Sequence, residues 1–234
     1  MDTSLPAALG VGFLLGIRHA LDADHVAAVS TLVGRHRSVA RSCLLGAFWG
    51  AGHTAALLAA GIAVLAFKLT MSPELERGLE TAVGWVLILL GGHVLLRSLS
   101  ATVLHRHAHR HDGAAHSHLH VHLGHSGQAT APDHVHLLEL GGRPFLVGLL
   151  HGMAGSAALM LLALTAIPSA VGGLCYILVF GIGSTAGMLL LSGMIGLPFA
   201  MTADRAPRLN TAIQALAGAV SLVLGLVLAA SGGA

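Results

Sequence analysis

The sequence carries few charged and few aromatic residues. Of its 234 residues, 9% are charged, 4% are aromatic and 55% are hydrophobic, whereas an average soluble domain has about 25% charged residues. The apolar runs are long enough to cross a hydrocarbon core of about 30 Å as helices, and none alternates as a membrane strand would. The composition predicts a helical integral membrane protein whose first partner is the lipid bilayer, with no nucleic-acid partner.

Other absences narrow the function classes. With two cysteines, Cys43 and Cys175, a disulfide framework is not expected. The sequence has no Gly-x4-Gly-Lys-Ser/Thr loop to bind a nucleotide, and it has neither a His-Glu-x-x-His pair nor a serine elbow. We therefore expect no enzyme and no nucleotide-driven pump. Asp2 stands where a signal peptide would carry Lys or Arg, so the first residues are expected to begin the mature protein.

The apolar runs predict an all-α polytopic membrane protein with six transmembrane helices. These helices are expected at roughly residues 5 to 34, 43 to 68, 79 to 99, 144 to 167, 173 to 198 and 210 to 230, with Pro73, Pro144, Pro168 and Pro207 at or near their ends. Nine of the twelve Lys and Arg residues fall in the connections 35 to 41, 97 to 143 and 205 to 208. By the positive-inside rule these connections are cytoplasmic and both termini lie outside.

The two halves of the chain resemble each other. GIRHALDADHVA (16 to 27) aligns with GLLHGMAGSAAL (148 to 159), GAGHTA (50 to 55) with GIGSTA (181 to 186), and LETAV (79 to 83) with LNTAI (209 to 213). Similar offsets in chain order predict a 3+3 internal repeat. Because three spans are an odd number, the second half enters from the opposite side, as in the inverted repeats of secondary transporters, whose substrate sites lie near the membrane midplane. The predicted units are a first repeat at 1 to 100, a histidine-rich connection at 101 to 142 and a second repeat at 143 to 234.

A polar cluster, RHALDADH, interrupts the first predicted helix at residues 18 to 25. A continuous helix over residues 5 to 33 would be about 44 Å long, which is longer than the membrane requires. Short apolar pieces on either side of a polar break are typical of a discontinuous helix that lines a cavity. We therefore expect a bend or break here.

The residue types in this cluster point to a metal ion. On an unbroken helix His19, Asp22 and His25 share one face, and local unwinding would let Asp24 join them. Imidazoles with carboxylates suit Ni(II), Co(II) or Zn(II). A bound dication, with Arg18 beside it, would offset the cost of two carboxylates in the membrane. A structural Arg-Asp network or a proton relay is the alternative.

Other histidines are candidates for the same site. His53, followed by Thr54 in the second predicted span, would supply a missing ligand, although a lone intramembrane histidine is also typical of hydrogen-bonded helix packing. His151, the repeat partner of His19, is a candidate lining residue, but its half of the chain lacks the matching carboxylates.

Eleven of the seventeen histidines lie in the connection between the halves. Its low apolar content predicts disorder, and alternating His-x-His is typical of labile capture of Ni, Cu or Zn ions. A proton buffer or a biased linker is the alternative. The capture residues are His105, His107, His109, His111, His116, His118, His120, His122, His125, His134 and His136.

These motifs resemble a known family. RHALDADHVAAVSTL is similar to the His-x4-Asp-His signature of the nickel/cobalt transporter (NiCoT/NicO) superfamily, and GAFWGAGHT to its second signature. The chain is most similar to the six-span, UreH-type branch of urease-accessory membrane proteins, with a connection similar to that of RcnA-type exporters. The resemblance covers nearly the whole chain and implies roles for His19, Asp24, His25 and His53. The further acidic motifs of the larger permeases are not visible here.

The residues and the resemblance together predict a secondary transporter of a divalent transition metal. The expected cargo is Ni(II) with Co(II) as competitor and Zn(II) as a further candidate, held by His19, Asp22, Asp24, His25 and His53, and no prosthetic group is expected. The resemblance favours uptake across a bacterial-type inner membrane and delivery to a cytosolic nickel metallochaperone. Efflux by proton exchange and an anion carrier of the sulfite-exporter type are the alternative functions.

Overall fold

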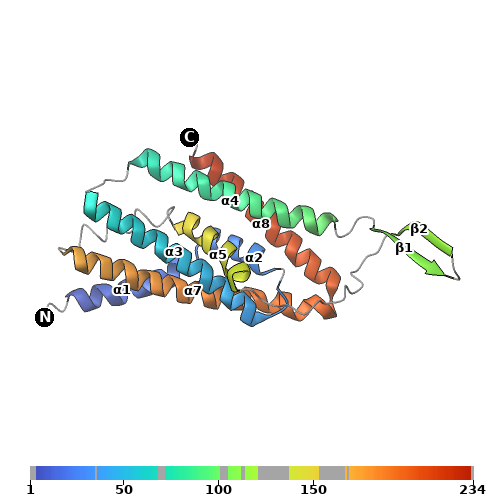
Figure 1. The fold of residues 1–234 in the computed structure, drawn as a ribbon. Helices are drawn as coiled ribbons and strands as arrows, with labels where there is room; N and C mark the ends of the chain where they lie inside the picture. Colours follow the sequence, from blue (N-terminus) through green and yellow to red (C-terminus); the bar gives the residue numbers. More distant parts are fainter. Residues whose placement is uncertain are drawn as a thin grey trace.

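The computed structural model describes residues 4 to 34, 36 to 67, 72 to 100, 105 to 111, 114 to 120, 137 to 152, 167 and 169 to 232. Within these ranges the chain is helical except for one hairpin (Figure 1). The helices are α1 (Ser4–His19), α2 (Ala23–Val33), α3 (Val39–Phe67), α4 (Pro73–Ser100), α5 (Leu137–Gly152), α7 (Ala170–Arg205) and α8 (Pro207–Gly232). The predicted all-α class is confirmed for this part of the chain.

Four of these helices are long and apolar enough to cross a membrane, namely α3, α4, α7 and α8. The pair α1 and α2 passes the same test when it is counted as one broken span, which gives up to five spans in the described ranges. The fourth predicted span, 144 to 167, begins within α5, and most of it lies outside the described residues. The number six and the repeat therefore stay predictions.

The prolines mark two helix starts and two helix interiors. Pro73 and Pro207 are the first residues of α4 and α8, where a missing N–H is harmless. Pro144 lies inside α5, so its predicted position at a helix end is wrong. Pro198 lies inside α7, which continues to Arg205. An internal proline removes one backbone hydrogen bond, and close packing of α5 and α7 against α3 keeps both helices continuous.

A hairpin occupies part of the histidine-rich connection. Strands β1 (His105–His111) and β2 (Ala114–His120) pair antiparallel with His105 opposite His120, and they extend beyond one end of the helical bundle (Figure 1). This differs from the disorder that the composition predicts. The alternation of histidine with other residues has the period of two that a strand requires. Overall composition does not contain this order of residues.

The first membrane helix is broken, as the polar cluster predicts. Residues 20 to 22 separate α1 from α2, and the two helix axes differ by 56°. The backbone N–H groups of Leu21 and Asp22 bond the carbonyls three residues earlier, so the helix tightens and then ends. Asp22 is extended at the N-cap of α2, but its carboxylate does not cap the helix. That carboxylate is free to bind elsewhere.

Glycines let the central helices cross at backbone contact. A Cβ on Gly52 of α3 would collide with the carbonyl oxygen of Phe145 on α5, and a Cβ on Gly183 of α7 would collide with that of Phe13 on α1. Small residues at a crossing allow this close approach in membranes. The contacts of α5 with α3 therefore mirror those of α1 with α7.

The same reciprocity is present where α3 meets α7. Gly50 of α3 faces Thr185 of α7, and Gly181 of α7 faces Thr54 of α3. The two threonine hydroxyls lie 3.1 Å apart, and that of Thr54 also donates to the carbonyl of Gly181 at 3.0 Å. Each helix thus places a glycine against a threonine of the other helix.

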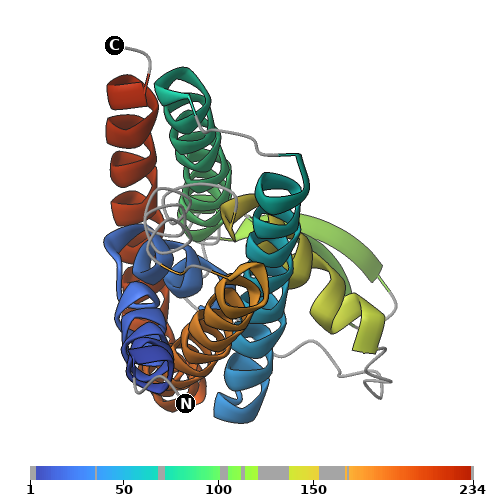
Figure 2. The ribbon, with the colours of Figure 1, turned by 90° about the vertical axis from the view of Figure 1, so that its left-hand side faces the viewer.

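Helices α4 and α8 form a separate pair. Gly84 packs on Gly225 and Gly91 on Gly218, each at backbone distance. Seen along the bundle, this pair lies to one side of α1, α3 and α7, and the short helix α2 lies between the two groups (Figure 2). Helix α2 contacts α4, α7 and α8, so the broken first helix occupies the interior.

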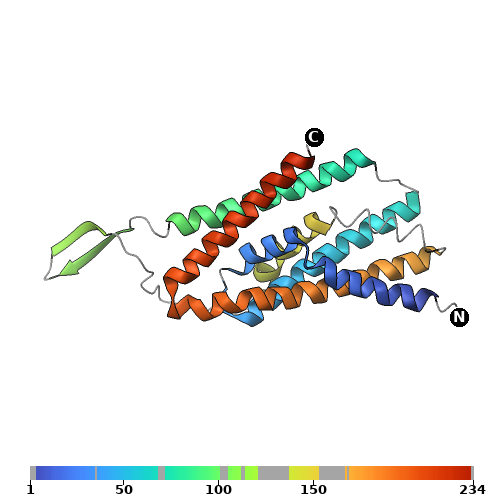
Figure 3. The ribbon, with the colours of Figure 1, turned by 180° about the vertical axis from the view of Figure 1, so that it is seen from behind.

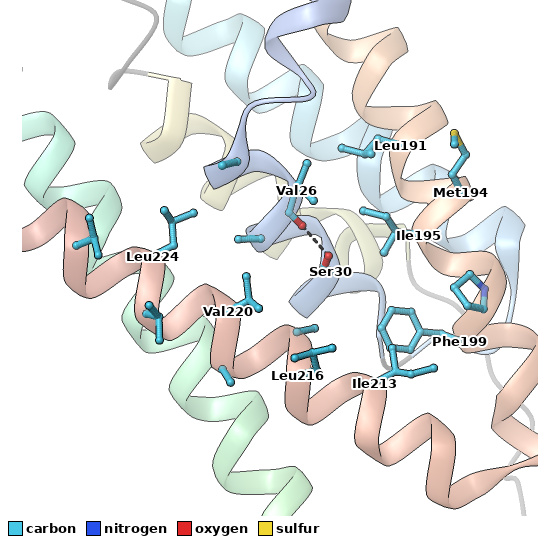
Figure 4. A pocket seen from close by; sticks show the side chains of 17 residues that line it. Val26, Ser30, Leu191, Met194, Ile195, Phe199, Ile213, Leu216, Val220 and Leu224 are labelled. Carbon is cyan, nitrogen blue, oxygen red and sulfur yellow. Dashed lines mark hydrogen bonds between the residues drawn. The ribbon is translucent and has the colours of Figure 1, made fainter.

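An apolar crevice exposes one side of α2. Helices α7 and α8 meet at Ala206 and then diverge (Figure 3), and α2 lies behind the opening. The crevice has a volume of about 1040 Å³. Val26 and Ser30 of α2 lie in it between Ile195 of α7 and Val220 of α8 (Figure 4). The only hydroxyl among the labelled side chains, that of Ser30, bonds the carbonyl of Val26 at 2.7 Å, so the surface is apolar.

Candidate metal centre

Four histidines from four helices meet at the break in the first membrane helix. His19 ends α1, His25 lies in the first turn of α2, His53 lies on α3 and His151 on α5. All four side chains are buried. Their rings pack against one another, with centroids 4.5 Å apart for His19 and His25 and 4.6 Å for His25 and His151. We call these four residues the histidine cluster.

The cluster lies deep in the bundle. His53 is fourteen residues from either end of α3, which is about 21 Å along the helix axis. His19 is the last residue of α1, about 22 Å from Ser4. The break therefore brings the end of one short helix and the start of another to mid-depth, beside the middle of a full-length span.

Two carboxylates hold three of the imidazoles. Nδ1 of His19 donates to Asp22 at 2.8 Å, and Nδ1 of His25 donates to Asp24 at 3.1 Å. The second oxygen of Asp24 accepts from Nε2 of His151 at 2.8 Å. Because a carboxylate only accepts hydrogen bonds, each of these ring nitrogens carries the proton. Asp24 thereby links α2 to α5.

The opposite ring nitrogens are left without partners. Nε2 of His19, Nε2 of His25 and both nitrogens of His53 are buried and have no hydrogen-bond partner among the residues that the structure describes. Buried polar atoms are usually hydrogen-bonded, and each exception calls for an explanation. An imidazole whose Nδ1–H is held by a carboxylate presents a lone pair at Nε2, which is the arrangement typical of metal-binding histidines.

These donors are close enough to share one ion. One nitrogen from each of His19, His25 and His53 lies within 4.8 Å of the others. Because metal to imidazole bonds are about 2.1 Å, two donors on one ion are at most about 4.2 Å apart. Three donors spaced evenly around one ion are about 3.6 Å apart, so inward movement of at most about 0.7 Å by each ring would complete the coordination. A second group, Asp24, His25 and His151, meets the same distance limit and shares His25.

The other predicted site residues are not part of the cluster, and neither is His93, which the sequence analysis did not select. Arg18 is exposed and belongs to neither ligand group. Thr54 bonds α7, as described above, and acts as a helix contact beside His53. His93 is exposed on α4. Of the connection, His122, His125, His134 and His136 lie outside the described residues, and His105, His107, His109, His111, His116, His118 and His120 belong to the hairpin backbone.

Trp49 packs against the cluster, and the sequence analysis did not select it. Its ring is fully buried and stacks on His25 with centroids 5.3 Å apart. It also meets His151 edge-on at 5.6 Å. Trp49 precedes His53 by four residues, a spacing that places both side chains on one face of a helix. That spacing within GAFWGAGHT was the available signal.

Several helices are long and apolar enough to cross a membrane, and they surround a histidine cluster at mid-depth. These features are typical of a polytopic membrane protein, and imidazoles are common metal ligands. The family model described as NicO, high-affinity nickel-transport protein, matches residues 6–232. The chain belongs to this family. The resemblance seen in the motifs is confirmed, and the family assigns the chain to nickel transport across a membrane rather than to catalysis.

The chain is also similar to individual proteins over nearly its whole length. The chain is 38% identical over 229 residues to the urease accessory protein UreH of Bacillus sp. (strain TB-90), covering 96% of this chain and 91% of the relative. It is 26% identical over 233 residues to the chloroplast protein FOR GROWTH AND FERTILITY 2 of Arabidopsis thaliana, covering 99% of this chain and 58% of the relative. No solved structure gives a significant match.

Proposed function

We propose that the protein is a secondary transporter that carries Ni(II), with Co(II) as a competitor, and that the histidine cluster binds the ion during transport. The observation that supports this most directly is the set of unpartnered nitrogens on His19, His25 and His53, which lie within reach of one ion. Imidazole nitrogen favours borderline ions such as Ni(II), Co(II) and Zn(II) over Mg(II) or Ca(II), which prefer oxygen.

In this proposal Asp22 and Asp24 act first through the rings that they hold. Asp22 is 52% exposed and Asp24 26% exposed, and both accept from imidazole N–H groups on the side away from the unpartnered nitrogens. Such carboxylates fix the ring and raise its basicity. Asp24 also belongs to the second ligand group with His25 and His151, which gives the ion a neighbouring position that shares one ligand.

The binding site is tested with protein that lacks residues 105 to 136, so that the connection does not contribute. We expect one Ni(II) per chain by calorimetry, and we expect His25→Ala to remove that binding because His25 belongs to both ligand groups. The matched control is His93→Ala, which removes an exposed histidine on α4 and should leave the affinity unchanged. Full affinity in His25→Ala would rule out the cluster as the site.

We further propose that the chain is a 3+3 inverted repeat with six spans. The reciprocal glycine contacts support this. Gly52 and Gly183 are 131 residues apart, their partners Phe145 and Phe13 are 132 apart, and these offsets equal those of the aligned motifs. Reciprocal contacts at a constant offset are what a two-fold relation between halves produces. The alternation of the two halves around the cluster would then expose it to each side in turn.

The proposed orientation has both termini outside and the histidine-rich connection in the cytoplasm of a bacterial-type inner membrane. The clustering of arginines in three connections supports this orientation. An inside-negative potential drives a dication inward at about 2.3 kcal/mol per charge per 100 mV, which favours uptake, followed by release to a cytosolic metallochaperone.

Direction is tested by the flux of radioactive nickel in reconstituted vesicles of known orientation. Under an inside-negative potential we expect accumulation in vesicles with the native orientation, and we expect unlabelled Co(II) to reduce it. Movement in the opposite direction that depends on an imposed proton gradient would show efflux by proton exchange, in which the histidine-rich connection would gather cytosolic ions.

A further inference from the structure

A second cavity opens beside the histidine cluster and carries three carboxylates. Its volume is about 240 Å³, and its polar lining consists of His19, Asp22, Asp24 and Glu80. The rest of its wall is apolar and comes mainly from α4 and α8, including Val83 and Leu224. We call it the acidic cavity. Leu224 and Ala23 also line the apolar crevice of Figure 4, so the two openings share a wall.

Glu80 differs from Asp22 and Asp24, because no side chain in the described part of the chain pairs with it. It lies half-buried on α4, at the start of the predicted span 79 to 99, in a helix that is long and apolar enough to cross a membrane. In the described part of the chain it has no ion-pair partner, unlike Asp204, which pairs with Arg37 at 2.8 Å. An unpaired carboxylate inside a membrane span is costly and marks an ion pathway in many membrane proteins.

His19 connects the acidic cavity to the histidine cluster. Its Nδ1 side bonds Asp22, which also lines the cavity, while its buried Nε2 has no partner and belongs to the His19, His25 and His53 group. An ion in the cavity is therefore one imidazole ring away from the proposed binding position. The buried, unpartnered Nε2 of His19 beside the cavity points to a ligand, which the three carboxylates alone would not do.

The cavity has the size of a hydrated ion. A water molecule occupies about 30 Å³ in the liquid, so 240 Å³ corresponds to roughly eight waters. This volume exceeds that of the six water ligands of a hydrated divalent cation, at about 30 Å³ each. Carboxylates then attract it through their charge, and the imidazoles replace the waters later.

The position of Glu80 indicates the side from which the cavity is reached. Glu80 follows Pro73 by seven residues, which is about 10 Å along α4, whereas the cluster lies about 21 Å from either end of α3. The start of α4 lies at the end of the bundle opposite to the hairpin (Figure 1). Glu80 is therefore nearer than the cluster to that end.

From these observations we infer that the acidic cavity is the access vestibule for hydrated divalent cations on the side opposite to the histidine-rich connection, and that Glu80 captures the ion there before it reaches the cluster. This inference rests on the proposed transport function. It assigns to Glu80 a role in capture and none in the discrimination between metals, because carboxylates attract Mg(II) and Ni(II) alike.

The test is nickel flux in vesicles by wild type, Glu80→Gln, Glu80→Asp and the matched control Glu76→Gln. Glu76 lies one helical turn before Glu80 on α4 and does not line the cavity. Since local fields raise capture rates by about ten-fold or more, we expect Glu80→Gln to raise KM about three-fold to ten-fold with Vmax within about two-fold. We expect Glu80→Asp to restore most of the wild-type KM and Glu76→Gln to match wild type.

Two further measurements separate capture from a structural effect. KM of the wild type should rise with ionic strength more steeply than that of Glu80→Gln, because salt screens the attraction. The ratio of Ni(II) to Co(II) transport should stay the same in both proteins. If Glu80→Gln fails to insert, Leu228→Lys places an opposing charge in the cavity wall from α8 and should raise KM with Glu80 intact.

The outcomes distinguish this inference from the function on which it rests. Absence of nickel binding and flux in wild type would remove the proposed function. Wild-type flux together with equal KM values in Glu80→Gln and Glu76→Gln would overturn the vestibule and leave the proposed function standing. Loss of the single bound Ni(II) in Glu80→Gln would also overturn it, since Glu80 would then be a ligand.

Discussion

At the scale of single residues, carboxylates hold three of the four imidazoles in the cluster and leave other ring nitrogens available to a metal ion. The Nδ1 atoms of His19 and His25 are occupied by Asp22 and Asp24, so only the Nε2 atoms are free to bind. The distinction between a ligand and a residue that orients a ligand can be measured, because the two roles have different consequences for affinity and for stoichiometry.

Asp22→Asn should weaken nickel binding without removing it. Loss of an outer carboxylate of this kind lowers metal affinity by about 10-fold to 100-fold, and the stoichiometry measured by calorimetry should stay at one ion per chain. Asp204→Asn, which changes an exposed carboxylate paired with Arg37, serves as the control. A complete loss of binding in Asp22→Asn would show that Asp22 is a direct ligand.

Nickel binding should also depend on pH in a definite direction. An imidazole binds a metal only when its ligand nitrogen is unprotonated, and the free side chain titrates near pH 6.5. For protein without residues 105 to 136, the apparent affinity should fall as the pH decreases below the pKa of the free side chain, because protons compete with nickel for the ligand nitrogens. An affinity that stays constant down to about pH 4, where carboxylates titrate, would indicate carboxylate ligands in place of imidazoles.

The residues of the site were predictable to different degrees. The motif spacing identified His19, His25 and His53, and the repeat pointed to His151. The geometry of an unbroken helix could not assign roles to Asp22 and Asp24, since the break changes the directions of both side chains. Glu80 escaped notice because its place in the same cavity as Asp22 and Asp24 depends on how α4 and α8 pack against α2, and local sequence carries no signal for that packing.

At the scale of elements, the glycine contacts decide how closely the helices cross. Gly52 and Gly183 each leave no space for a Cβ, since the carbonyl oxygen of a neighbouring helix occupies it. Gly52 lies next to His53 on α3, and Gly183 lies on α7, which also contacts His19 through Phe180. The position of the cluster therefore depends on backbone contact at the crossings.

Gly52→Val should destabilise the protein and displace the cluster. Overpacking typically costs about 1 to 3 kcal/mol, and in a chain of this length each kcal/mol shifts Tm by about 2 to 4 °C. We expect a Tm lower by several degrees in detergent and weaker nickel binding. Gly92→Val on α4, where nothing lies within 4 Å of the added Cβ, is the control. Equal Tm values for both variants would contradict the packing argument.

At the scale of the whole molecule, we propose that the helical bundle transports nickel without the histidine-rich connection. The hairpin extends beyond the helices (Figure 1), and among the described residues the candidate ligands of the histidine cluster come from α1, α2, α3 and α5. The sequence predicted the helical class and the break in the first helix from hydropathy and length. The hairpin was missed because low apolar content outweighed a two-residue alternation.

Deletion of residues 105 to 136 should lower nickel capacity and leave transport measurable. The intact chain should bind several ions, with the excess lost in the deletion variant, while nickel flux in vesicles persists because the cluster is intact. Flux and total bound metal are measured on the same preparations. Complete loss of flux with normal membrane insertion would make the connection part of the transport path.

The stacking of Trp49 on His25 gives the protein an optical reporter of its own. The chain has two tryptophans, and the other, Trp85, is 57% exposed on α4, so Trp85→Phe leaves a single indole beside the cluster. Ni(II) and Co(II) have open d shells and quench nearby fluorescence, whereas Zn(II) does not. Emission from Trp49 should therefore fall on addition of nickel or cobalt and persist with zinc, so that occupancy can be followed in real time without a label.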